Sequence, residues 1–113
     1  MEIIGIACPL FVPIVEEGWE NSDVAYITAQ KYLLELKEHN IDSLVLGCTH
    51  YPALRYTLNK VFENKITLVN PAYETAKAVT IMLKENSLKT DKLDGGNYEF
   101  YVSDDPEKFR RIG

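Results

Sequence analysis

The chain has 113 residues, of which 46% are hydrophobic and 26% charged, a composition that excludes disorder and fits one globular domain or one half of a two-lobed protein. Its net charge of −5, with scattered basic residues, argues against nucleic acid as a partner. No apolar stretch approaches the roughly 20 residues of a membrane span, no secretory signal follows Met1, and two irregularly spaced cysteines make no disulfide framework, so we expect a cytoplasmic protein that does not bind membranes.

The first half of the chain alternates apolar runs with helical patterns. Residues 2–7 are apolar and β-branched, as in a strand buried on both faces of a parallel sheet. Residues 21–23 offer capping side chains before a helix that closes at 38–40 and has apolar residues at helical spacing, namely Ala25, Ala29, Tyr32, Leu33 and Leu36. Residues 43–47 predict a second strand, and Pro52 opens a second helix.

The second half continues this alternation and then changes character. Residues 66–69 predict a third strand, and Asn70 and Pro71 predict the start of a helix with an apolar stripe formed by Ala72, Ala76, Val79 and Leu83. The polar residues 87–97 predict a linker-like loop, before a last strand at 98–102 and a short helix from Pro106. Strands alternating with helices predict an α/β fold, with a parallel sheet flanked by helices.

Ligands of parallel α/β sheets bind outside the carboxyl ends of the strands, which directs attention to residues 7–9, 47–52 and 69–71. The second segment contains the most candidate site residues, and its Cys48 lies where a strand turns into a helix. The N–H groups and positive end of that helix favour a thiolate and can hold a substrate carboxylate. The alternative is that Cys48 is a small buried hydrophobe. Its polar neighbours Thr49, His50 and Tyr51 favour a functional turn.

Other types of site fit the sequence less well. Zinc needs three or four ligands, whereas Cys48 and His50 supply two, so no metal is expected. A nucleophile elbow needs glycine on both sides of the nucleophile, and only Gly47 is present. Cys8 is followed by Pro9 and apolar residues, which favours a packing role, and His39 is interpreted as structural at a helix end.

Three segments of the chain, in their order and spacing, form a recognisable set of motifs: ACPLFVPIVE at 7–16, LVLGCTHYP at 44–52 and PAYETA at 71–76. They resemble bacterial glutamate racemase, within the aspartate and glutamate racemase superfamily. The resemblance covers the C-terminal half of that enzyme. The N-terminal half of the family carries an Asp-Ser-Gly-x-Gly-Gly block and a Cys-Asn-Thr block that this sequence lacks.

The resemblance implies a cofactor-independent, two-base interconversion of L-glutamate and D-glutamate, the D form being needed for peptidoglycan. By this resemblance, Cys48 is one of the two bases and His50 assists proton transfer at Cys48. Thr49 binds substrate through its hydroxyl or N–H group, and Glu16 supports the same side of the site as Cys48. The alternative for Glu16 is a solvated surface acid.

The resemblance also implies a division of the chain. Residues 1–70 belong to the second catalytic lobe, and residues 71–113 pack back on a first lobe that the sequence lacks. We therefore expect glutamate and the missing N-terminal half as partners, an inactive isolated chain, and self-association into a homo-oligomer.

Two other functions stay open on the sequence. One is a racemase or isomerase of the same superfamily that acts on aspartate or another small diacid. The other is a non-catalytic binding or assembly fragment whose site is incomplete.

Overall fold

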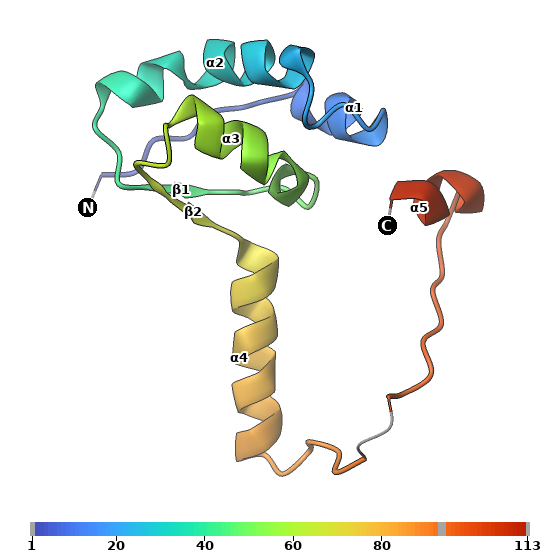
Figure 1. Ribbon diagram of the computed structural model, residues 1–113. Helices are drawn as coiled ribbons and strands as arrows, with labels where there is room; N and C mark the ends of the chain where they lie inside the picture. Colours follow the sequence, from blue (N-terminus) through green and yellow to red (C-terminus); the bar gives the residue numbers. More distant parts are fainter. Residues whose placement is uncertain (1, 93–94, 113) are drawn as a thin grey trace. The chain divides into compact units, whose positions relative to one another are not determined.

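A computed structural model describes residues 2–92 and 95–112. The chain forms two compact units, residues 1–74 and 75–113. Figure 1 shows the elements of the first unit, which are α1 (Phe11–Glu16), α2 (Asp23–Glu38), β1 (Ser43–Val45), the 3-10 helix η1 (Tyr51–Leu54), α3 (Arg55–Val61) and β2 (Thr67–Val69). Helix α4 (Pro71–Glu85) begins in this unit, and α5 (Pro106–Ile112) lies in the second.

Strands β1 and β2 pair in parallel, with Leu44 opposite Leu68. The ladder continues beyond both strands, because the Leu46 N–H donates to the Val69 carbonyl at 3.0 Å and the Thr67 N–H donates to the Asp42 carbonyl at 2.9 Å. This parallel pair, joined through η1 and α3 and flanked by helices, confirms the predicted α/β class.

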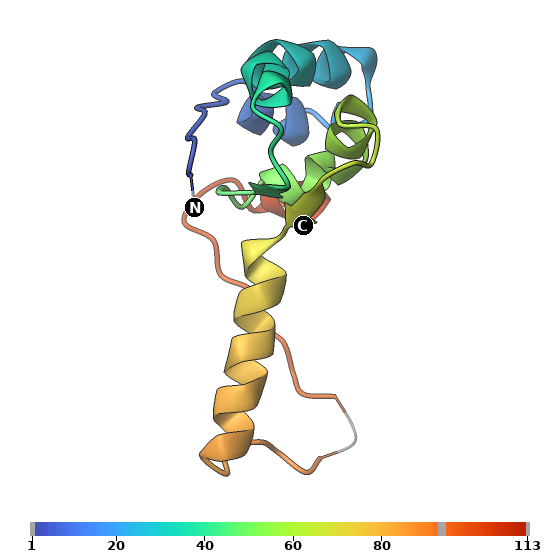
Figure 2. The same cartoon turned by 90° about the vertical axis from the view of Figure 1, so that its left-hand side faces the viewer.

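The helices cover one face of the sheet. Figures 1 and 2 show α2 and α3 on the same side of β1 and β2. Leu44 and Leu68 pack against the core on that side, whereas Val45, which points the other way, is 62% exposed. The carboxyl ends of both strands lie at one edge of this one-sided sheet.

Two predicted strands are wrong. Residues 2–7 and 98–102 contain no strand in the structure. Ile4 and Ile6 pack partly against the core while Ile3 is 80% exposed, so the first segment is not buried on both faces. An apolar, β-branched run favours an extended backbone, but a strand also needs a hydrogen-bonded neighbour, and none pairs with these segments in the described part of the chain.

The predicted helices are confirmed, and the structure contains one further helix that was not predicted. The Ser22 hydroxyl accepts a hydrogen bond from the Ala25 N–H at 3.3 Å and caps α2, as the sequence indicates. Helix α1 was not predicted, because it has six residues and contains Pro13, which the first turn of a helix tolerates. In the predicted loop, residues 87–92 and 95–97 form neither helix nor strand, and 93–94 lie outside the described residues.

The core of the first unit lies between its helices and the covered face of the sheet. Ala25 and Ala29 of α2 are fully buried, and their small side chains let α3 approach closely. The Thr57 hydroxyl, also buried, donates to the Glu20 carbonyl at 2.6 Å and so fixes α3 to the segment before α2. This packing involves a set of buried side chains: Phe11, Leu33, Leu36, Leu54, Leu58 and Val61.

The second unit contains little packed structure of its own. Along α4 and α5, whose residues are all described, none is buried. The predicted stripe on α4 is exposed, with Val79 at 40% and Leu83 at 37%. Across residues 2–92 and 95–112, no helix has the length and apolar character needed to cross a membrane.

Candidate active site

The turn after β1 presents three polar side chains in succession. Leu46 is buried, and the chain then turns through Cys48, Thr49 and His50 into η1. The Tyr51 N–H donates to the Cys48 carbonyl at 3.1 Å, which closes the turn. Cys48 and His50 are half-buried and Thr49 is exposed, so the turn faces the surface at the carboxyl end of β1.

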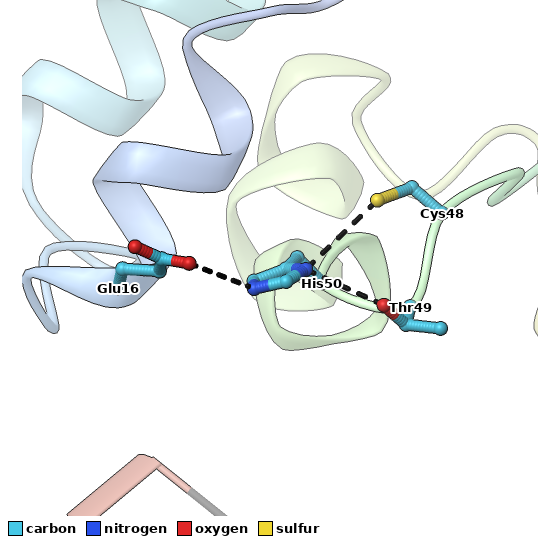
Figure 3. A network of polar contacts seen from close by, with 4 residues as sticks. All are labelled: Glu16, Cys48, Thr49 and His50. Carbon is cyan, nitrogen blue, oxygen red and sulfur yellow. Dashed lines mark hydrogen bonds and ion pairs between the residues drawn. The ribbon is translucent and has the colours of Figure 1, made fainter. Parts of the chain in front are cut away.

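His50 is the centre of a small polar network (Figure 3). Its Nδ1 atom lies 4.0 Å from Cys48 Sγ and 3.4 Å from Thr49 Oγ1, and its Nε2 atom lies 3.5 Å from Glu16 Oε1. The structure thus brings together all four residues singled out from the sequence. Glu16 comes from α1, and the other three come from the turn after β1.

The arrangement assigns complementary roles to the two ring nitrogens of His50. A carboxylate beside Nε2 favours a proton on that atom, and in the neutral ring Nδ1 then carries a lone pair. The groups facing Nδ1 are a thiol and a hydroxyl, both of which can donate. The network can therefore accept a proton from Cys48 and stabilise the resulting imidazolium with Glu16.

Two backbone N–H groups at the start of the following helix are used within the chain. The Tyr51 N–H donates to the Cys48 carbonyl and the Ala53 N–H donates to the His50 carbonyl at 3.1 Å, while Pro52 has no N–H. The helix opens as a 3-10 turn, and the binding of a substrate carboxylate by N–H groups of this turn stays a prediction.

Cys8 has the packing role expected for it. The side chain is 4% exposed within the core, and its thiol donates weakly to the Ile6 carbonyl at 3.8 Å. Burial raises the pKa of the Cys8 thiol, which keeps it protonated. His39 caps the end of α2, and its Nε2 atom lies 3.9 Å from Glu35 Oε1, in keeping with its structural interpretation.

Two grooves among the described residues lie apart from the polar network. A groove of about 290 Å³ lies beside Leu36 and Phe62, and another of about 830 Å³ lies beside Arg55 and Tyr73. Neither is lined by Cys48 or His50. Among residues 2–92 and 95–112, no three His, Cys, Asp or Glu side chains are placed to hold a metal ion.

Fold and contacts together define an α/β lobe that carries a thiol, an imidazole and a carboxylate at the carboxyl end of a parallel strand. No family model matches the chain. It is, however, 43% identical over 113 residues to glutamate racemase of Geobacter metallireducens, covering 100% of this chain and 42% of the relative. It is 43% identical over 107 residues to glutamate racemase of Neisseria meningitidis, covering 95% of this chain and 39% of the relative.

Solved structures give the same result. Glutamate racemase of Francisella tularensis in complex with D-glutamate matches 98% of this chain with a TM-score of 0.87 and 34% identity. The Thermus thermophilus enzyme in complex with β-chloro-D-alanine matches 95% of the chain with a TM-score of 0.83 and 36% identity. The chain spans 41% of each of these structures. Over nearly its whole length the chain is therefore similar to one part of glutamate racemases, as the resemblance predicted, and it spans about two fifths of the length of these relatives.

Proposed function

We propose that the chain is the C-terminal part of a glutamate racemase, in which Cys48 transfers the α-proton of glutamate on one face of the substrate. The similarity to glutamate racemases supports this function, and so does the D-glutamate bound by the Francisella tularensis relative. Glutamate is preferred here over aspartate because each relative named above is a glutamate racemase. The proposed chemistry uses protein thiols and needs no cofactor.

The two proton transfers conserve protons and electrons and need no further reactant. A Cys48 thiolate takes the α-proton from one enantiomer, so that the Cα–H bond breaks, an S–H bond forms and the electron pair stays on the substrate as a carbanion. A second acid on the opposite face then donates a proton to Cα, which inverts the centre. In the reverse direction Cys48, now a thiol, is the donor.

The neighbours of Cys48 have distinct roles in this proposal. His50, at 4.0 Å from Sγ, takes or returns the thiol proton, and Glu16 stabilises the charge that the imidazole then carries. Thr49 binds the substrate through its hydroxyl or N–H group, which its exposed position leaves accessible. Substrate binding at Thr49 draws the hydroxyl away from His50 Nδ1, 3.4 Å distant, and leaves that atom to Cys48.

In this proposal the second proton-transfer group comes from outside these 113 residues. Cys8 is buried in the core with a raised pKa and is therefore no candidate. In our proposal residues 1–70 form the second catalytic lobe, and residues 71–113 pack on the remainder of the enzyme. The exposed apolar side chains of the second unit support that packing, and in its absence they favour self-association into an oligomer.

The contact of His50 with both Cys48 and Glu16 is the observation that carries this function. Its test is to co-express the chain with the rest of a relative's enzyme and to measure glutamate racemisation and deuterium uptake at Cα in D2O. We expect racemisation from the pair and none from this chain alone. Racemisation by the chain alone, or none from a correctly assembled pair, contradicts the proposal.

A further inference from the structure

Tyr51 joins the turn of Cys48 to the segment that leads into α1. Its hydroxyl donates to the Cys8 carbonyl at 3.3 Å. Its ring meets the Phe11 ring edge-on, with the centroids 5.4 Å apart and the planes at 86°. One side chain, next in sequence to His50, therefore contacts both Cys8, which lies just upstream of α1, and Phe11, the first residue of that helix.

Phe11 is a fixed partner for Tyr51. It is 2% exposed within the core, and its ring also meets the Tyr32 ring of α2 edge-on, at 5.4 Å and 83°. The Tyr32 hydroxyl also accepts a hydrogen bond from the Leu10 N–H at 3.2 Å. The start of α1 is held between two tyrosines, one from α2 and one from the turn of Cys48.

The position of α1 decides where the Glu16 carboxylate lies. Glu16 is the last residue of this helix, five residues after Phe11, and a helix of that length extends about 7.5 Å with little freedom to bend. A displacement of the turn relative to Phe11 therefore changes the distance between His50 and Glu16, which is 3.5 Å.

We propose that Tyr51 is a positioning residue, which fixes the turn of Cys48 and His50 against α1 so that His50 lies between Cys48 and Glu16. The inference rests on the proposed function, because it assigns Tyr51 to the Cys48 site. The pKa of the Tyr51 phenol is raised by burial, and further by the negative charge that Cys8 and Cys48 can carry. The phenol therefore remains a hydrogen-bond donor at neutral pH.

The test uses Tyr51→Phe, which keeps the ring that contacts Phe11 and removes only the hydroxyl. Its matched control is Tyr26→Phe, because Tyr26 is also half-buried and also loses one hydroxyl hydrogen bond, in this case from Gln30 at 3.3 Å. Both variants of the 113-residue chain are treated briefly with iodoacetamide at neutral pH, and mass spectrometry measures the alkylation rates of Cys48 and Cys8 separately.

A misplaced His50 accepts the Cys48 proton less well, whereas a loosened fold exposes both cysteines. We expect Tyr51→Phe to lower the Cys48 rate about threefold without lowering the Cys8 rate, and Tyr26→Phe to leave the Cys48 rate at the wild-type value. An unchanged or higher Cys48 rate in Tyr51→Phe, or an equal fall in Tyr26→Phe, overturns the proposal.

The readout separates this inference from the proposed function. Alkylation of Cys48 requires neither glutamate nor the rest of the enzyme. If Cys48→Ala left racemisation intact in the co-expressed pair, the proposed function would fail while the alkylation rates still reported on Tyr51. If racemisation depended on Cys48 and Tyr51→Phe left its alkylation unchanged, only the positioning role would be lost.

Discussion

The Nε2 atom of His50 lies 3.5 Å from Oε1 of Glu16, so that the last residue of α1 meets the turn after β1. This contact fixes which edge of the imidazole faces the carboxylate and turns Nδ1 towards Cys48. A carboxylate that orients a histidine in this way favours one tautomer and stabilises the protonated ring. In the proposed mechanism Glu16 therefore acts on Cys48 through His50.

Glu16→Gln should slow the alkylation of Cys48 by iodoacetamide about threefold at neutral pH, because a neutral amide stabilises the His50 imidazolium less than a carboxylate does. Glu17→Gln is the matched control, since Glu17 is exposed at the end of the same helix. Equal rates in wild type, Glu16→Gln and Glu17→Gln would show that the 3.5 Å contact has no influence on the thiol.

Cys48 should react faster than Cys8 with iodoacetamide in the intact fold. The Cys8 thiol is 4% exposed and burial raises its pKa, whereas Cys48 is half-buried beside His50. Mass spectrometry of peptides after a brief treatment measures both rates, and unfolding in urea should bring them together. Equal labelling of the two cysteines in the native chain, or preference for Cys8, contradicts this description of the turn.

The parts of the fold that follow from local chemistry could be predicted from the sequence. Ser22 caps α2 through a bond to a residue three positions away, and the apolar spacing of Ala25, Ala29 and Leu33 marks the buried face of that helix. The strands at 43–45 and 67–69 also follow from short apolar runs between turns. Each of these signals lies within a few residues of the structure it determines.

Features that depend on distant partners could not be predicted in the same way. Residues 2–7 have the composition of a strand, but pairing with a neighbour decides whether a strand forms. The use of the Tyr51 N–H within a 3-10 turn also has no clear sequence signal. The resemblance indicated only that Glu16 supports the side of Cys48. Its contact with His50 was not predicted, because that contact depends on how α1 packs, and Tyr51 received no role although it follows His50 directly.

Phe11→Ala should destabilise the first unit strongly, because Phe11 is 2% exposed between Tyr32 and Tyr51 and its removal leaves a cavity. We expect a loss of about 3–5 kcal/mol in the free energy of unfolding, measured in urea. Leu10→Ala is the control, since the adjacent Leu10 is 54% exposed and should cost less than about 1 kcal/mol. Similar losses for the two variants would mean that Phe11 does not anchor α1.

The isolated chain should self-associate through the apolar stripe on α4. Val79 and Leu83 are both exposed, and replacing both with lysine should shift the mass measured by light scattering towards that of a monomer. Glu85→Lys makes the same change in net charge on the same helix and should leave association intact. A monomeric wild-type chain, or equal effects of the two variants, shows that this stripe does not drive association.

Racemisation by the co-expressed pair tests the central role of Cys48 most directly. The assay follows the optical rotation of glutamate in both directions and deuterium uptake at Cα, using wild type, Cys48→Ala and Cys48→Ser. Circular dichroism and the free energy of unfolding check that each variant folds. Cys8→Ala is the control, because it removes the other thiol from a buried position.

We expect Cys48→Ala to lower racemisation by at least about a hundredfold in both directions, since one of the two proton-transfer groups is lost. Cys48→Ser should be almost as inactive, because an alcohol is a far weaker acid than a thiol, and Cys8→Ala should retain activity if it folds. Near wild-type turnover by a folded Cys48→Ala pair would contradict the assignment of Cys48 as an acid and base.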